Sequence, residues 1–243
     1  INQENLNYES ESMWNYELGI KTSLIDNTFF VQASLFYQDR DDVQTKQSFV
    51  SSIVSEIEGG ECPCTFADYI GNAASGSNYG FELELLWLIN DKLEISSSLG
   101  ILETEFKNFA SYSHVDADPS NGVAVNLSGR DQSHAPNYQF NFFLNYQLNE
   151  NIFINLNVES KDKFYFSDRH DAQSDSYTLL NFLIGYKLDS WEISLFGKNL
   201  TDEDYKTRGF GSFGNDPRKF YVTEPYNQYA APRVIGVSGK KSF

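Results

Sequence analysis

The chain has 243 residues, enough for one sizeable β domain or for one to two ordinary domains. Its net charge is −16 with no basic stripe, so we expect no nucleic-acid partner. Mean hydropathy is −0.45, and the longest clear apolar run, Leu85–Ile89, is far shorter than the roughly 20 residues that a membrane helix needs.

Aromatic residues make up 16 % of the chain, with 20 Phe and 15 Tyr. Both residue types favour pleated, half-buried surfaces, so the composition favours an all-β fold. The acidity has two readings. One is plain solubility, because net charge speaks to solubility and association rather than to fold. The other is a set of acidic surface loops that meet cations or divalent-bridged lipopolysaccharide.

Apolar and polar residues alternate strictly in short segments along the chain, which predicts β-strands with one apolar and one polar face. In chain order, the predicted strands are residues 14–24, 28–49, 81–89, 93–101, 140–148, 151–166, 180–186, 191–198 and 233–243. Short turns rich in Asp and Asn alternate with long polar connections. The turns are residues 26–27, 90–91, 149–151 and 188–190, and the connections are 40–78, 106–136, 167–175 and 200–230.

This order of turns and loops is typical of outer-membrane β-barrels, which have short periplasmic turns and longer extracellular loops. Aromatic residues near the short turns predict a girdle at the membrane interface. They are Phe29, Phe30, Trp87, Tyr146, Phe153, Tyr186 and Trp191. A soluble antiparallel sandwich shows the same alternation. However, residues 28–49 and 151–166 extend well beyond its usual length of about five or six residues.

Nine strands make an incomplete barrel, because bacterial single-chain barrels have an even number of strands. An open sheet in lipid would also leave unpaired backbone groups along its edges. We therefore expect residues 1–243 to form part of a larger antiparallel transmembrane β-barrel. The first residues show no signal peptide, which predicts a mature or truncated sequence.

Three stretches resemble the TonB-dependent outer-membrane receptors, in the expected order. Residues 14–21, WNYELGIK, resemble the family's NYELGxK strand. Residues 198–205, KNLTDEDY, resemble its (R/K)NLTDxxY segment, and residues 232–243 resemble its closing strand, which begins Pro-Arg and ends in Phe. The resemblance implies about nine C-terminal strands of a barrel of about 22 strands. It also implies that the N-terminal plug domain is absent from this chain.

By the same resemblance, the protein takes up a scarce nutrient by energy-coupled transport across the outer membrane of a Gram-negative bacterium. The first expectation is a ferric siderophore or another iron complex; cobalamin, haem and glycans are further substrates of the family. The implied partners are a TonB-type energy-transducing protein, which acts through the missing N-terminal region, outer-membrane lipid and lipopolysaccharide, the barrel-assembly machinery and a small-molecule metal chelate. No cofactor and no enzymatic activity are implied.

No catalytic constellation is visible, because His114, His134 and His170 are isolated from any nucleophile motif or phosphate-binding loop. Arg and His pair with carboxylate or chelate oxygens, and aromatic rings stack on flat ligands. Candidate ligand-binding residues of these types occupy outer strand ends and long loops: Tyr165, Phe166, Arg169, His170, Tyr205, Arg208 and Phe210. The alternative is that they stabilise the rim of the barrel.

The chain ends on Phe243, which resembles the signal that the outer-membrane assembly machinery recognises. Anchoring in the periplasmic aromatic girdle is a second, compatible reading. Cys62 and Cys64 fall short of the roughly four ligands of a metal cage, so we expect no metal site. They form either a local disulfide or a pair with a cysteine elsewhere.

Two other functions stay open at this point. One is a small passive outer-membrane barrel or adhesin of about eight strands, which would have no plug domain. The other is a secreted acidic β-sandwich that binds glycans, which would fold in plain buffer without detergent.

Overall fold

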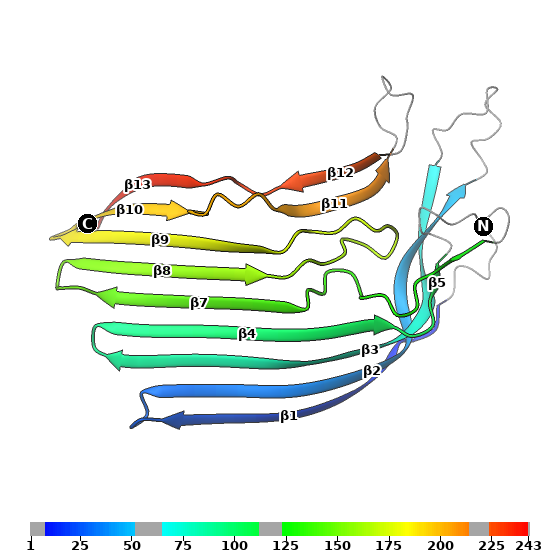
Figure 1. Cartoon of the computed structure of the whole chain (residues 1–243), viewed down its shortest axis with the longest axis horizontal. Coiled ribbons are helices and arrows are strands. Elements are labelled where there is room, and N and C mark those ends of the chain that lie inside the picture. Colours follow the sequence, from blue (N-terminus) through cyan, green and yellow to red (C-terminus); the bar gives the residue numbers. More distant parts are fainter. Residues whose placement is uncertain (1–7, 52–64, 112–122, 214–223, 243) are drawn as a thin grey trace, which may run out of the picture.

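The computed structural model describes residues 8–51, 65–111, 123–213 and 224–242. Within these ranges the regular elements are all β-strands, and no helix is long and apolar enough to cross a membrane. Nine strands form one antiparallel sheet in the order β1-β2-β3-β4-β7-β8-β9-β10-β13 (Figure 1). Their bounds are β1 Ser12–Leu24, β2 Phe29–Ser51, β3 Thr65–Asn90, β4 Leu93–Phe106, β7 Tyr138–Gln147, β8 Ile152–Lys161, β9 Tyr177–Leu188, β10 Trp191–Lys198 and β13 Val234–Lys241.

The nine predicted strands and the four short turns are confirmed. Figure 1 shows the short turns together at one end of the sheet and the long connections at the other end. Two small two-stranded sheets lie within the long connections. They pair β5 Ala110–Ser111 with β6 Val125–Asn126, and β11 Lys206–Phe213 with β12 Glu224–Tyr229.

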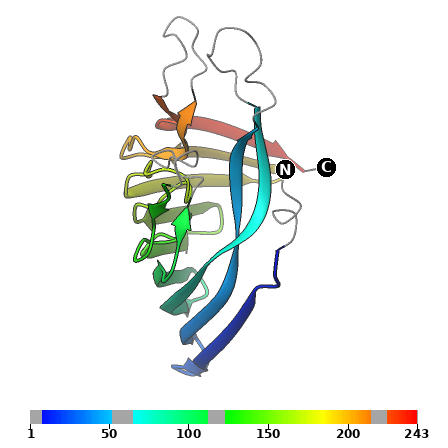
Figure 2. The same ribbon diagram turned by 90° about the vertical axis from the view of Figure 1, so that its right-hand side faces the viewer.

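Two predicted boundaries were wrong. The strand predicted at 151–166 ends at Lys161, because the following residues fold back on themselves: Phe164 and Ser174 exchange hydrogen bonds, and Tyr165 pairs with Gln173. The connection predicted at 40–78 is mostly strand. A bulge between Arg40 and Val43 shifts the register, and the β2–β3 ladder then continues beyond the rest of the sheet (Figure 2).

The strand register gives the sheet two chemically distinct faces. One row of the apolar face runs across five strands through Leu18, Leu35, Phe81, Ile101 and Tyr138. One row of the polar face runs across six strands through Lys21, Gln32, Glu84, Ser98, Asn141 and Glu159. In a transmembrane barrel the apolar face meets lipid and the polar face lines the interior. We call them the outer and inner faces.

The outer face is uncovered in the described part of the chain. Leu18 is 75 % exposed and Val237 is 72 % exposed. A β-sandwich would bury this face against a second sheet, so its exposure argues against that alternative. The described apolar core is instead small and lies at the long-loop end, where Val43, Phe106 and Phe109 pack with Leu127.

The sheet is open, since β1 and β13 each have one paired neighbour among the described strands. Backbone groups along a free edge cannot be satisfied in lipid. Nine strands with two free edges therefore make a part of a barrel and do not fit a closed barrel of eight strands.

The aromatic girdle is confirmed for most of its predicted members. Phe29 and Trp87 pair on the outer face, with ring centres 5.7 Å apart. Phe30 and Phe153 were wrongly assigned, because each is one residue out of phase and lies on the inner face. The Phe153 ring lies against Gly185 of the next strand, where an added Cβ would come within 2.2 Å of it.

Candidate functional site

The long-loop end of the inner face is covered by two connections, residues 123–137 and 162–176. Gln132 fixes the first connection to the sheet. Its backbone N–H donates to Thr104 Oγ1 at 3.0 Å, and its side chain donates to Asn78 at 2.8 Å. It also accepts a hydrogen bond from Arg40 at 3.1 Å. These contacts tie the connection to β2, β3 and β4 together.

Arg130 joins the two connections. Its side chain is 9 % exposed, and its guanidinium donates to the carbonyl oxygens of Ser167 at 3.1 Å and His170 at 2.6 Å. It also pairs with the exposed carboxylate of Asp171 at 2.6 Å and lies 3.9 Å from the centre of the Tyr165 ring. Arg130 therefore connects residues that are about 40 positions apart in the chain. We call Arg130 and the residues of 162–176 that it contacts the Arg130 unit.

Several of the predicted ligand-binding residues make packing contacts or hydrogen bonds within or next to this unit. Phe166 is 6 % exposed and packs on Gly209 of β11, so it braces the β11–β12 hairpin. His170 is 8 % exposed, and its Nδ1 accepts the N–H of Ala172. Arg169 is half-buried, with its N–H directed at Ser167. Together with Tyr165 beneath Arg130, these residues hold the connection in place, so their contact with a ligand stays a prediction.

Arg208 and Phe210 lie on β11, and both are exposed. The guanidinium of Arg208 lies 5.2 Å from the centre of the Phe210 ring. Phe166 reaches Gly209 between them, so the hairpin and the second connection are in contact. His114, Cys62, Cys64 and Phe243 lie outside the described residues. Within those residues, no group of three or more His, Cys, Asp or Glu could hold a metal ion.

A row of asparagines crosses the inner face toward this end. Asn157 donates to Asn141 at 2.7 Å, and Asn181 donates to Asn157 at 2.8 Å. The backbone N–H of Asn199 donates to Asn181 at 3.0 Å, and the Asn199 side chain closes a turn by bonding both the N–H and the carbonyl of Glu203. The asparagine of the KNLTDEDY stretch thus ends the row and sets the turn after β10.

Asp202 connects this turn to the final strand. Its carboxylate accepts hydrogen bonds from the backbone N–H of Arg233 at 3.0 Å and from the Arg233 guanidinium at 3.1 Å. Arg233 also donates to the carbonyl of Leu200 at 3.3 Å. The two stretches that resemble a family, residues 198–205 and 232–243, are therefore joined to each other in the fold.

The turn places the ring of Tyr205 against that of Tyr177, which lies on the inner face at the long-loop end of β9. The two rings stack with their centres 4.0 Å apart and their planes at 27°. Burial, followed by the negative charge of Glu159, raises the pKa of the Tyr205 phenol above its ordinary value, and the phenol is a neutral hydrogen-bond donor at neutral pH as any tyrosine is. Lys206, the next residue after Tyr205, forms an ion pair with Asp175 at 3.0 Å.

Only Tyr205 of this group was predicted from the sequence. Tyr177 and Glu159 were missed, although both fall in phase with the polar residues of β9 and β8. Phase places Tyr177 on the inner face but does not show that a later turn will bring onto it a second ring from 28 residues further along the chain.

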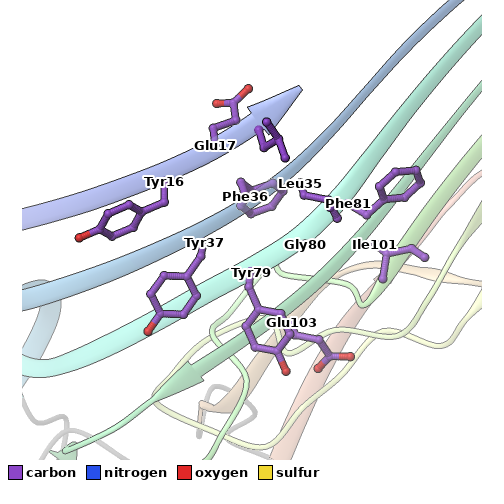
Figure 3. Close-up of a pocket in the computed structure, with 11 residues that line it drawn as sticks. Tyr16, Glu17, Leu35, Phe36, Tyr37, Tyr79, Gly80, Phe81, Ile101 and Glu103 are labelled. Carbon is purple, nitrogen blue, oxygen red and sulfur yellow. The ribbon is translucent and has the colours of Figure 1, made fainter. Parts of the chain in front are cut away.

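Two hollows lie on the faces of the sheet. One, of about 690 Å³, is on the inner face, where Phe30, Leu86 and Phe143 lie beside the charged side chains of Lys21 and Glu84. The other, of about 530 Å³, is a groove on the outer face of β1 to β4 (Figure 3). The outer groove faces lipid, so it is not part of a route through the barrel.

The chain matches the family model described as "TonB dependent receptor-like, beta-barrel" over residues 1–200. Among curated proteins, it is 26 % identical over 220 residues to the ferric-pyoverdine M114 receptor PbuA of Pseudomonas sp. (strain M114). This match covers 86 % of the chain and 23 % of PbuA.

Solved structures of similar fold include the siderophore receptor PiuA from Acinetobacter baumannii, with a TM-score of 0.70 and 19 % identity over all of this chain and 30 % of PiuA. The ferric yersiniabactin uptake receptor FyuA from Yersinia pestis gives a TM-score of 0.67 and 20 % identity, over 97 % of this chain and 30 % of FyuA. The chain thus spans less than a third of these relatives. With the family model matching most of its length, the chain belongs to the TonB-dependent receptors, β-barrel proteins of the Gram-negative outer membrane.

Proposed function

We propose that this chain is the C-terminal barrel region of a receptor that takes up a ferric siderophore or a related iron complex by energy-coupled transport. The observation that carries the proposal is the stacked pair of Tyr177 and Tyr205 beside Glu159, at the long-loop end of the inner face. The names of PbuA, PiuA and FyuA, each a receptor for a siderophore or its iron complex, support the same substrate class.

The chemistry of this end suits a chelate. Aromatic rings offer stacking surfaces to flat catecholate or hydroxyphenyl groups. The neutral Tyr205 phenol supplies a hydrogen-bond donor to chelate oxygens, and Arg208 on the hairpin supplies a cation that pairs with them. The Arg130 unit holds the neighbouring connection, so that these groups stay in place without a ligand. The chain's part in transport is to bind and orient the chelate, which calls for no bond making.

The partners form part of the same proposal. The inner hollow combines a polar rim with three apolar side chains, which suits contact with a plug domain inside the barrel. A TonB-type protein would act through that plug, and the assembly machinery would recognise the end of the last strand. Phe243 lies outside the described residues, so its role as an assembly signal rests on the resemblance alone.

The test is binding of ferric chelates to the complete receptor, purified in detergent. Loss of a stacking ring is worth about 0.5–1.5 kcal/mol, so Tyr205→Ala should weaken binding about two- to tenfold. Tyr205→Phe should retain the stacking. Tyr186→Ala removes a tyrosine from the outer face at the opposite end and is the matched control, with unchanged affinity expected. Equal affinities for wild type and Tyr205→Ala across the chelates that bind would overturn the placement of the site.

A further inference from the structure

Glu159, Tyr177 and Tyr205 meet on the inner face at the long-loop end of β8 and β9. Glu159 lies opposite Leu179 in the register of the two strands, and Tyr177 is two residues from Leu179 on the same face. Glu159 and Tyr177 are therefore diagonal neighbours, about 7–8 Å apart, which is within reach of long and aromatic side chains. The turn after β10 adds the ring of Tyr205, which stacks on Tyr177 with the ring centres 4.0 Å apart.

The carboxylate of Glu159 forms no hydrogen bond and no ion pair within the residues that the structure describes. Lys161 lies two residues along β8 on the same face but forms no ion pair with this carboxylate, and Lys206 is bound to Asp175 at 3.0 Å. Leu179, opposite Glu159, is only 8 % exposed. The carboxylate therefore lies beside an apolar side chain that is shielded from water, and its charge is not compensated by a described neighbour.

The two tyrosine rings also lack a cation of their own. In the neighbouring connection, the guanidinium of Arg130 lies 3.9 Å from the centre of the Tyr165 ring. Within the described part of the chain, no Lys or Arg side chain lies over Tyr177 or Tyr205 in the same way. The stacked pair thus places aromatic rings beside an unpaired carboxylate.

A cation satisfies both parts of this arrangement. An aromatic ring attracts a cation that lies over its face, and a carboxylate accepts charge-assisted hydrogen bonds from an ammonium or a guanidinium group. Glu159 and both tyrosines are half-buried, so water screens these attractions less than it does at an exposed site. An anion in the same place would meet the like charge of Glu159.

We propose that Glu159, Tyr177 and Tyr205 form a subsite for an ammonium or guanidinium group of the transported chelate. The subsite rests on the proposed uptake of an iron chelate and narrows the substrate to chelates that carry an organic cation. The cation lies over the tyrosine pair, and its N–H groups donate to Glu159. Arg208 meets the iron-bound oxygens, so the two opposite charges of the site fix the direction in which the chelate lies. Chelates whose charges are all negative are disfavoured.

The test compares two ferric chelates that differ in a single charge. One is a linear trihydroxamate with a free terminal amine, and the other is the same chelate acetylated at that amine. A tris-catecholate scaffold, with and without an amine, supplies a second pair. Dissociation constants are measured at neutral pH and constant ionic strength with the complete receptor, purified in detergent.

Three variants locate the effect. Glu159→Gln removes the charge and keeps the size of the side chain, whereas Glu159→Asp keeps the charge. The matched control is Glu94→Gln. Glu94 is also a glutamate of the inner face, but it lies on β4 near the short turns, where it accepts a hydrogen bond from Asn145 at 3.1 Å.

Wild type and Glu94→Gln should bind the amine form about tenfold more tightly than the acetylated form, an effect within the range of a partly desolvated cation–π contact. Glu159→Gln should reduce this ratio to about twofold or less, mainly by weakening binding of the amine form. Glu159→Asp should keep a higher ratio than Glu159→Gln. The ratio measured on wild type stands even if a variant fails to assemble.

Equal affinity of wild type for the two forms of a scaffold that binds would overturn the cation subsite and leave the uptake of an iron chelate standing. An unchanged ratio in Glu159→Gln would also overturn it, because the preference would then come from the overall net charge of −16. Binding of neither scaffold in either form would contradict the proposed uptake itself, and the subsite with it.

Discussion

The Arg130 unit makes the sharpest prediction about the long-loop end. Arg130→Met keeps most of the side-chain volume and removes the two hydrogen bonds to carbonyl oxygens and the contact with the Tyr165 ring. Hydrogen bonds to a charged group contribute about 1.5–3 kcal/mol each, and a desolvated cation–π contact about 2 kcal/mol. One guanidinium makes all of them, so they are not additive, and we expect a loss of about 3–4 kcal/mol in the local opening free energy.

The ion pair with Asp171 contributes little to this total. The Asp171 side chain is 70 % exposed, and pairs of this kind are worth about 0–1 kcal/mol. Asp171→Asn is therefore the matched control: it removes the charge and leaves the buried hydrogen bonds of Arg130 in place.

Amide hydrogen exchange in residues 162–176 of the complete receptor measures the opening free energy directly. Arg130→Met should accelerate exchange about 100- to 1,000-fold, and Asp171→Asn by no more than about fivefold. If the two variants behave alike, or if Arg130→Met leaves exchange unchanged, the buried hydrogen bonds do not hold this connection.

Three further predictions concern other parts of the chain. Gly185→Ala should displace the Phe153 ring and cost about 1–3 kcal/mol in thermal unfolding, whereas Gly100→Ala, with open space at its Cβ, should cost less than about 1 kcal/mol. Burial raises the pKa of Asp168, although hydrogen bonds to Ser133 act to lower it. The connection of residues 162–176 should therefore gain stability as pH falls through that raised pKa toward 3.8. Asp168→Asn should abolish this gain. Burial also acts to raise the pKa of Glu11, but hydrogen bonds to its carboxylate outweigh this and lower it. The structure near Glu11 should therefore lose stability, and its amides should exchange faster, as pH falls below 4.5 through the lowered pKa. This pH dependence is opposite in sign to that expected at Asp168. The same sign at both sites would contradict both assignments.

The membrane-spanning sheet could be predicted because its signal is local. Side chains alternate between two faces with a period of two, and lipid requires one face to be apolar over the whole span. Each segment therefore carries its own evidence of strand and face. The same rule exposes the two errors in the girdle: Phe30 and Phe153 are aromatic and near turns, but their phase puts them on the inner face.

The loop-end structure could not be predicted because its contacts are non-local. Beyond the membrane, alternation predicted the β2 side of the β2–β3 ladder as far as residue 49, but residues 65–78 of β3 mix polar and apolar types without a regular period of two, so their strand was not predicted. Phe164 and Phe166 alternate like strand residues, yet they pack within a connection that Arg130 clamps from 40 residues away.

The candidate ligand site likewise has one part that the sequence indicates locally and another that depends on non-local contacts. Sequence resemblance drew attention to residues 198–205, and the structure gives the reason in physical terms. Asn199 builds the turn, Asp202 secures it to Arg233, and Tyr205 is delivered onto Tyr177. The choice of Tyr205 followed from its residue type and its place in a long connection, whereas its partner depended on a turn geometry that no local pattern encodes.

The most direct test of the central claim is iron uptake by cells that lack this receptor. The complete gene, supplied in trans, should restore uptake of radioactive iron from at least one member of a panel of ferric chelates. Uptake should stop when a protonophore collapses the inner-membrane gradient, and Tyr205→Ala should reduce it at equal receptor levels. If no ferric chelate is taken up while cobalamin or a glycan rescues growth, the iron assignment is wrong. If uptake persists without the gradient, the energy-coupled mechanism is wrong.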